Sequence, residues 1–391
     1  MSDYDPKLAD LVRELNQAAG SQPSESQPLE APAEKRIGDV AGLDAILLSA
    51  TSRGASDILL TAGSPPALRI HGELLPVGEG ALSDDGIRAL TEPLLTADWM
   101  KELKSQQTLD FSFVRESLGR FRANLHYQRG TLAATIRLLP EEMPTIESLR
   151  LPPSLSNLAE SRKGLILVTG AAGSGKSSTL AALIDRINRL RACHIVTIED
   201  PIEYRHQNRR AVVEQIEVGR DARGFAAALR SILRQSPDVI LVGEIRDTET
   251  MSTAITAAET GHLVLATLHT NDAVRAVGRV VDSFPGDNQN QVRQQLSLGL
   301  LAVVAQQLVP SVDGRERFPA VEILLNNTAV SNLIRRGEDH LLRSQLSLGR
   351  AEGMCMMEES LAELARRGRI RRETAEAHAS RPDELRRCLD R

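Results

Sequence analysis

The sequence predicts an α/β protein in which a smaller α+β domain precedes a larger domain with a mostly parallel sheet. Three observations lead to this prediction. Apolar and polar residues alternate with period two over 119–140, as in a β-hairpin. Beyond residue 158, strand-like, loop-like and helix-like segments follow one another in turn. A stretch with several prolines, 141–154, separates the two patterns.

The composition is that of an ordinary soluble protein. The 391 residues suffice for two or three domains, with 41% hydrophobic and 25% charged residues. Only 3% of the residues are aromatic, so we expect cores made of Leu, Val, Ile and Ala. The net charge of −5 argues against nucleic acid as a partner.

Neither the cysteines nor the apolar segments indicate export or membrane insertion. Cys193, Cys355 and Cys388 are far apart and form no CxxC pair, which excludes a sequence-local zinc site. The N-terminus is acidic and has no signal-peptide pattern. The longest apolar stretch, 296–309, contains polar residues and is too short to cross a bilayer, so we expect a buried helix there. We therefore expect a cytoplasmic protein without a transmembrane segment.

The first part of the chain combines a polar tether with short structured segments. Residues 7–19 have the apolar spacing of a short amphipathic helix, and 20–35 are rich in Ser, Pro, Gln and Glu, as in a flexible tether. A helix is expected over Leu43–Ser52 and a strand over Asp57–Leu60.

The hairpin within 119–140 brings two arginines together. Arg129-Gly130 fits a two-residue turn. If Gln128 pairs with Thr131, Arg122 lies directly opposite Arg137. Like charges that face each other on a sheet are destabilising unless they splay into solvent or share an anion. The residues alone leave both interpretations open.

The clearest motif is a phosphate-binding loop. The apolar run LILVT (165–169) is followed by GAAGSGKS (170–177) and a helix over Ser178–Leu190, which matches GxxxxGK[ST] in its strand–loop–helix context. Backbone N–H groups of such a loop surround phosphates at the positive end of a helix. The expected nucleotide-binding residues are Gly170, Ala171, Ala172, Gly173, Ser174, Gly175, Lys176, Ser177 and Ser178. Lys176 is expected to reach the β- and γ-phosphates of ATP, and Ser177 to bind Mg²⁺.

A second motif, DVILVGEIRD (238–247), resembles the acidic strand that accompanies such a loop, yet its apolar run ends in Gly243 where an aspartate is usual. Glu244 follows directly. Another apolar run ends in Glu199, Asp200 and Glu203, which places carboxylates at the same edge of a parallel sheet. Asp200 also suits a simple turn or helix cap.

Two histidines flank a third apolar strand, GHLVLATLHT (261–270). His262 precedes the strand and His269 ends it. Such histidines are often only structural, but a pair beside a phosphate site could sense the γ-phosphate.

In order along the chain, VTGAAGSGKSS, TIEDPIEY, DVILVGEIRDTET, AAETGHLVLATLHTND and GRVVDSFP resemble the PilT-type retraction ATPases of type IV pili, in the secretion ATPase superfamily. The resemblance covers roughly residues 43–370. It implies an N-terminal PAS-like α+β domain, a RecA-like P-loop ATPase domain with C-terminal helices, and assembly into hexamers. The implied domains are an N-terminal extension (1–36), the PAS-like domain (37–140), a linker (141–157) and the RecA-like domain with its helical region (158–391).

The resemblance also assigns roles to individual residues. Glu244 corresponds to the glutamate near magnesium and Glu203 to the one proposed to prepare the attacking water; which of the two is the base stays open. His269 corresponds to the residue near the γ-phosphate, with His262 in support. Arg122, Arg137 and Arg279 correspond to arginines that reach the nucleotide, which favours the anion-binding interpretation of the hairpin. Arginine suits this role because its planar guanidinium binds phosphate oxygens at two points.

The implied function is a hexameric Mg·ATPase that powers pilus retraction and twitching motility at an inner-membrane platform protein. The C-terminal signature AIRNLIRE appears here as AVSNLIRR, with Ser331 and Arg336 replacing an arginine and a glutamate. The stretch VAQQLVPSVDGRERFPAVEILLN resembles an accessory retraction paralogue equally well. An accessory ATPase, a regulator of a partner motor, and a pilus-assembly or type II secretion ATPase are therefore alternatives. The pilus-assembly or type II secretion ATPase has less support, because the tetracysteine zinc insertion of those relatives is missing here.

Overall fold

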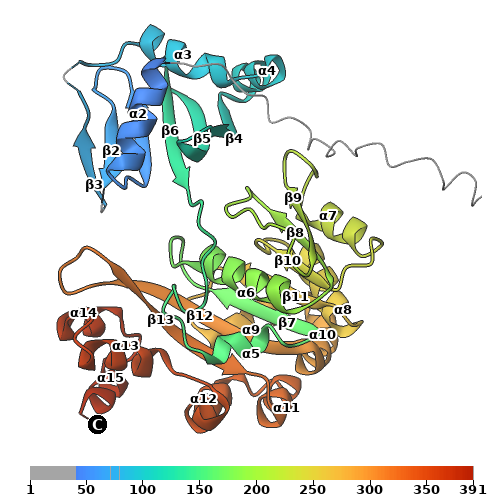
Figure 1. Cartoon of the computed structure of the whole chain (residues 1–391). Coiled ribbons are helices and arrows are strands. Elements are labelled where there is room, and N and C mark those ends of the chain that lie inside the picture. Colours follow the sequence, from blue (N-terminus) through green and yellow to red (C-terminus); the bar gives the residue numbers. More distant parts are fainter. Residues whose placement is uncertain (1–40, 71, 79, 391) are drawn as a thin grey trace, which may run out of the picture. The chain divides into compact units, whose positions relative to one another are not determined.

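The computed structural model describes residues 41–70, 72–78 and 80–390, which form two compact units (Figure 1). The predicted helix at 7–19 and tether at 20–35 lie outside the described residues. Of the described residues, the first unit holds 41–70 and 74–137, and the second holds 138–390 together with 72–73. Among the described helices, none combines the length and the apolar character needed to cross a membrane.

The first unit contains a sheet whose described strands are ordered β3-β2-β1-β6-β5-β4, with antiparallel pairing of β1 to β2 and β6 and of β4 to β5. Its elements are α2 (Ala41–Ser52), β1 (Asp57–Thr61), β2 (Ala67–Ile70), β3 (Glu73–Pro76), α3 (Asp84–Thr91), the 3-10 turn η1 (Glu92–Leu94), α4 (Ala97–Gln106), β4 (Thr108–Arg115), β5 (Gly119–Gln128) and β6 (Thr131–Leu139). The predicted helix, strand and hairpin are all present.

The hairpin forms because its turn matches the twist of its strands. Arg129 and Gly130 have φ values of 48° and 80°, the left-handed conformation of a two-residue hairpin turn. The Thr131 hydroxyl donates to the Gln128 carbonyl at 2.9 Å and closes the turn. Along β5, buried and half-buried residues alternate through His126, as the period-two pattern predicts.

The core of the first unit departs from the expectation of purely aliphatic cores. Trp99, Phe111, Phe113 and Phe121 follow one another in contact, with ring centroids 5.1, 6.0 and 5.3 Å apart. Four aromatic residues thus contribute to this small unit, one from α4 and three from β4 and β5.

The second unit contains a sheet in which the described strands are ordered β13-β12-β7-β11-β10-β8-β9, parallel except for β13. Its strands are β7 (Gly164–Thr169), β8 (His194–Glu199), β9 (Val212–Glu217), β10 (Val239–Val242), β11 (Leu263–Leu268), β12 (Leu300–Pro310) and β13 (Arg317–Leu325). Its helices are α5 (Ser154–Leu158), α6 (Lys176–Leu190), α7 (Phe225–Ile232), α8 (Thr248–Glu259), α9 (Ala273–Asp282), α10 (Gly286–Gly299), α11 (Thr328–Arg336), α12 (Leu342–Leu348), α13 (Met357–Arg366), α14 (Arg372–His378) and α15 (Pro382–Leu389), with 3-10 turns η2 (Asp339–Leu341) and η3 (Gly349–Glu352).

Both faces of this sheet are covered by helices, as expected. Leu165 and Leu167 of β7 point into a core with α7–α11, whereas Ile166 and Val168 point into a second core with α5 and α6. A strand buried on both faces is apolar throughout, which is why these strands show continuous apolar runs. Helices α13–α15 cover β12 and β13 through a separate apolar cluster (Figure 1).

One expectation needs correction. The apolar stretch 296–309 is not one buried helix, because α10 ends at Gly299 and β12 begins at Leu300. An apolar run buried on both sides has the same composition in a strand and in a helix, so periodicity could not separate them. Residues 141–157, expected to be a linker, belong to the second unit, where Ile146, Leu151 and Leu155 are buried in its core.

Candidate functional site

The loop 170–175 connects β7 to α6 and has the geometry of a phosphate cradle. Gly170, Gly173 and Gly175 have φ values of 146°, 75° and 88°. A Cβ at Gly170 would lie 2.2 Å from the Gln306 carbonyl oxygen, and one at Gly175 would lie 2.7 Å from the Gln306 Nε2. No heavy atom lies within 4 Å of a Cβ built on Gly173. Gly170 and Gly175 therefore allow β12 to approach the loop closely, and Gly173 leaves space beside the loop for a ligand.

Gln306 of β12 holds the cradle from behind. Its Nε2 donates to the Ser174 carbonyl at 2.8 Å, and its Oε1 accepts from the Thr179 hydroxyl at 2.7 Å, both in buried surroundings. One side chain thus joins the loop to the first turn of α6. Sequence reasoning did not identify Gln306 as part of the site; the available signal was a polar residue within an apolar stretch.

Lys176 begins α6 and folds back over the loop. Its Nζ donates to the carbonyls of Gly170 and Ala171 at 2.8 and 2.9 Å. Burial lowers the pKa of Lys176, while the nearby carboxylates of Glu244 and Glu203 act to raise it. Both predicted glutamates thus act on the charge of this lysine, and phosphate oxygens can replace the loop carbonyls as acceptors of its hydrogen bonds.

The next two residues of α6 point to different partners. Ser177 is exposed in the first turn, where its hydroxyl fits the expected Mg²⁺ ligand. Ser178 shares a hydrogen bond of 2.8 Å with the Tyr204 hydroxyl. This bond ties the helix to the segment that carries Glu203. A hydroxyl and carboxylates are oxygen donors of the kind that Mg²⁺ prefers, so Ser177 and Glu244 would suit this ion, which would offset the charge of bound phosphates.

The structure explains why a glycine occupies position 243. Its N–H donates to the Ile198 carbonyl at 2.7 Å, and a Cβ at Gly243 would lie 3.0 Å from that oxygen and 3.3 Å from the Glu199 Cα. The ends of β10 and β8 approach too closely for a larger residue without a shift of backbone. The carboxylate of this strand is therefore displaced by one residue, to Glu244.

Glu244 connects the acidic strand to the histidine at the end of β11. Its Oε2 lies 3.2 Å from His269 Nε2, and its Oε1 pairs with Arg246. The Glu244 side chain is 16% exposed and that of His269 is 54% exposed. The half-buried carboxylate thus positions a histidine whose ring remains accessible to a ligand.

The other acidic residues have separate surroundings. Glu199 accepts from the Thr197 hydroxyl at 2.7 Å and the Gln215 amide at 3.0 Å, and burial raises its pKa. Asp200 is exposed. Their strand, β8, neighbours β10 as expected, although β10 and β11 separate it from the P-loop strand β7.

His262 does not join this site within one chain. It precedes β11, and its carbonyl accepts from the Gly164 N–H at 2.9 Å at the start of β7. Its ring Nδ1 lies 3.0 Å from the Ala257 carbonyl oxygen. In a parallel pair, the starts of both strands share one edge of the sheet, and the cradle follows the opposite edge. Within one chain, His262 therefore lies at the opposite edge of the sheet from His269 and does not contact it.

The three predicted arginines lie outside the cradle of their own chain or in the other unit. Arg279 is exposed in the last turn of α9. Arg122 pairs with Asp110 at 3.4 Å, and Arg137 pairs with Asp57 at 2.9 Å. Each hairpin arginine thus pairs with a carboxylate from a strand outside the hairpin, and Asp57 also pairs with Arg69 at 3.7 Å. Their action on a nucleotide stays a prediction.

The altered C-terminal signature forms part of an intact helix, α11. The Ser331 hydroxyl donates to the Ser297 carbonyl at 2.6 Å, which joins α11 to the end of α10. Arg336 is exposed at the end of the helix. A small hydroxyl residue therefore fits position 331 as a contact between two helices.

Together, the sheet order, the strand–loop–helix cradle and the acidic and histidine residues at its edge define a P-loop nucleotide-binding protein. The family model described as type II/IV secretion system protein matches residues 133–381. This chain is 40% identical over 340 residues to the type IV pilus retraction ATPase PilT of Pseudomonas aeruginosa, covering 87% of this chain and 98% of that protein. It is 41% identical over 334 residues to the type IV pilus ATPase PilU of the same organism, covering 85% and 87%.

Two solved structures of similar ATPases also match the fold of this chain. The crystal structure of the pilus retraction motor PilT with bound ADP matches with a TM-score of 0.82 and 44% identity, over 88% of this chain and 98% of that one. The Legionella pneumophila ATPase DotB matches with a TM-score of 0.77 and 28% identity, over 88% and 97%. The chain belongs to the type II/IV secretion system protein family, in the group that includes PilT and PilU. Its fold is a PAS-like α+β domain followed by a RecA-like P-loop domain with C-terminal helices.

Proposed function

We propose that this chain is a Mg²⁺-dependent ATPase that powers type IV pilus retraction as a homo-hexamer in the cytoplasm, at the pilus base on the inner membrane. One observation carries the proposal: a chain that resembles a named retraction ATPase over nearly its whole length has Lys176 folded over its phosphate-binding loop, bonded to the carbonyls of Gly170 and Ala171. The proposed partner is an inner-membrane platform protein, with a paralogous pilus ATPase as a further partner.

The proposed chemistry is positioning and charge compensation at the γ-phosphate. Loop N–H groups and Lys176 bind the phosphates, and Ser177 and Glu244 hold Mg²⁺, which offsets the charge of the phosphate oxygens. Glu203 orients the attacking water, and His269, positioned by Glu244, contacts the γ-phosphate. Arg122, Arg137 and Arg279 compensate charge on nucleotide within the hexamer. Hydrolysis then drives the relative motion of the domains that disassembles the pilus.

The motor function is tested by counting surface pili by electron microscopy on a clean deletion strain and its parent. Excess pili with loss of twitching motility are expected, because pilus assembly then continues without retraction. A plasmid-borne wild-type copy should restore the parental count. Cells without pili would instead show that the protein drives assembly.

An accessory retraction ATPase is the second candidate. The two Pseudomonas aeruginosa relatives match this chain almost equally well, at 41% and 40% identity. An unchanged pilus count in the deletion strain, together with ATP hydrolysis by the purified chain, would favour this accessory role.

Replacing Glu244 by glutamine is expected to lower ATP turnover about 100-fold. The neutral amide cannot compensate the charge of Mg²⁺, and it offers His269 no negatively charged partner. Phosphate release by the purified chain measures the loss. Glu249→Gln is the matched control, since Glu249 lies on α8 and pairs with Arg230 at the surface. Equal turnover in the Glu244 variant and the wild type would remove Glu244 from the site.

A further inference from the structure

A buried ionic cluster connects the loop after β11 with the C-terminal helices. We define the histidine loop as residues 269–272, between β11 and α9. Ala273, the first residue of α9, donates its N–H to Glu322 Oε1 at 2.8 Å. Glu322 lies on β13 and is 1% exposed. The end of the histidine loop is thus held by a carboxylate from a distant part of the chain.

Glu322 lies level with the end of the phosphate-loop strand. In the sheet register it pairs with Ala305 of β12, which in turn pairs with Thr169, the last residue of β7. The Thr169 hydroxyl is 2.7 Å from that of Thr270, inside the histidine loop. The same edge of the sheet therefore carries the cradle, the histidine loop and the Glu322 carboxylate.

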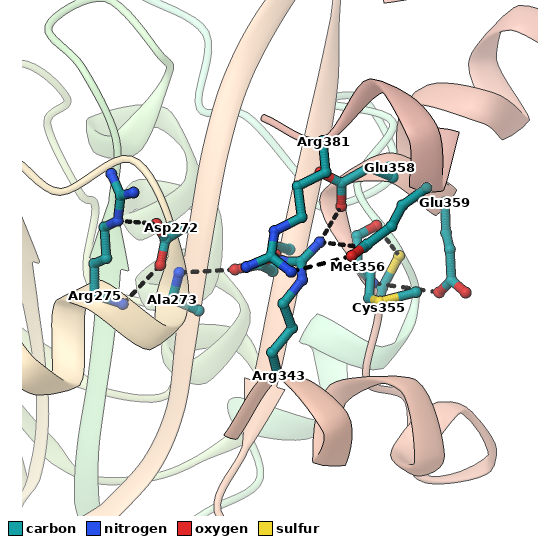
Figure 2. Close-up of polar contacts among 11 residues, drawn as sticks. Asp272, Ala273, Arg275, Arg343, Cys355, Met356, Glu358, Glu359 and Arg381 are labelled. Carbon is teal, nitrogen blue, oxygen red and sulfur yellow. Dashed lines mark hydrogen bonds and ion pairs between the residues drawn. The ribbon is translucent and has the colours of Figure 1, made fainter. Parts of the chain in front are cut away.

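Arg343 extends the cluster to the C-terminal helices. It lies on α12, and its Nη1 is 3.6 Å from Glu322 Oε2. Its Nη2 bonds Glu358 of α13 at 2.8 Å and Glu384 of α15 at 2.5 Å. Figure 2 shows Arg343 between Ala273 on one side and Glu358 on the other. One guanidinium therefore joins three carboxylates from three elements.

Burial makes this arrangement sensitive to displacement. Glu358 is 0% exposed and the Arg343 side chain is 17% exposed. Burial raises the pKa of Glu322, and the Ala273 N–H and Arg343 oppose that rise. Burying a charge is costly unless the charge is paired. If the histidine loop shifts and moves Ala273, Glu322 and Arg343 must move with it. Otherwise a buried polar group loses its hydrogen-bond partner.

We propose that Glu322 and Arg343 are positioning residues that couple the histidine loop to helices α13 and α15, so that the packing of these helices sets the placement of His269. The proposal rests on the proposed function, in which His269 contacts the γ-phosphate. It assigns Glu384, on the last described helix, an effect on hydrolysis although it does not contact the nucleotide site.

The test combines turnover with amide hydrogen exchange in the full-length chain. Glu384→Gln weakens the cluster from its outer end, where the Glu384 side chain is 32% exposed. It is expected to lower kcat about five-fold with little change in KM, and to speed exchange of the peptide covering 270–276 about five-fold with ADP present. Glu322→Gln, at the inner end, is expected to lower kcat about ten-fold. Glu363→Gln on α13, whose exposed side chain pairs with Arg366 and Arg367, is the control and should resemble the wild type.

The double variant separates coupling from local damage. If the two glutamates act through one path, Glu322→Gln combined with Glu384→Gln loses no more activity than Glu322→Gln alone. Independent effects would multiply to about fifty-fold, and that result would overturn the coupling. Wild-type exchange and kcat in Glu384→Gln would overturn it as well. If Glu322→Gln does not fold, Arg343→Lys, which keeps the charge but loses the forked geometry, replaces it in the same cycle.

The exchange measurement also separates this proposal from the proposed function. A wild-type chain that hydrolyses no ATP would contradict the ATPase, whereas faster exchange over 270–276 in Glu384→Gln would still support the coupling. If the wild-type chain hydrolyses ATP but Glu384→Gln leaves the exchange of 270–276 unchanged, only the coupling is contradicted.

Discussion

Replacing Lys176 by alanine is expected to lower ATP turnover by about 1,000-fold or more. The ammonium lies at the start of α6, hydrogen-bonded to the carbonyls of Gly170 and Ala171, and close to Glu203 and Glu244. Without it, the γ-phosphate loses a positive charge in a partly buried site, where such interactions contribute most to catalysis. The carboxylates of Glu203 and Glu244 also lose the favourable interaction with the lysine charge. Phosphate release at saturating ATP measures the effect.

The matched control for Lys176→Ala is Lys163→Ala. Lys163 is exposed and directly precedes β7, at the opposite end of the phosphate-loop strand. The Lys163→Ala substitution removes the same charge from the same unit, but far from the phosphate-binding loop, so we expect turnover close to the wild type. Both variants should retain the wild-type unfolding midpoint. A Lys176 variant whose turnover stays within a few-fold of the wild type would contradict the assignment of the cradle as the catalytic site.

Replacing Arg122 by alanine is expected to lower turnover about 1,000-fold while ADP binding is largely retained. An arginine that compensates charge in the transition state contributes about 10³–10⁵ in rate, whereas its share of ground-state binding is smaller. The measurement is a pair: phosphate release for turnover, and fluorescence titration with a labelled ADP for binding. Equal losses in the two would make Arg122 a ligand of the ground state instead.

The ion pair with Asp110 offers a control that is specific to Arg122. Asp110→Asn removes the carboxylate 3.4 Å from Arg122 but leaves the arginine in place. Such exposed pairs contribute only about 0–1 kcal/mol to stability, so both variants should fold. If Asp110→Asn lowers turnover as strongly as Arg122→Ala, the arginine acts through the sheet of the first unit and not on phosphate.

Local elements of this protein follow directly from its sequence. The turn at Arg129-Gly130 and the cradle at 170–177 depend on residues next to one another in the chain, because left-handed backbone angles and a strand–loop–helix junction are local properties. The two-sided burial of β7 likewise follows from its continuous apolar run. The predictions for these segments agree with the structure.

Contacts between segments that are distant in the chain could not be predicted from the sequence. His262 and His269 flank the same strand, yet a parallel sheet places the two ends of that strand at opposite edges. The apolar stretch 296–309 has no period that separates a helix from a doubly buried strand. The hairpin arginines gained partners, Asp110 and Asp57, from strands outside the hairpin.

The sequence by itself determined the family and the class of site, because the motif around Lys176 and the acidic and histidine segments each carry their chemistry locally; the roles of the individual residues stay predictions. Only the tertiary structure decided what surrounds them: Gln306 behind the cradle, the close approach of β8 that requires Gly243, and the cluster of Glu322 and Arg343 beneath the histidine loop. These contacts join residues that are far apart in the chain. The sheet order that brings them together depends on the packing of all strands and helices at once, and no single segment encodes it.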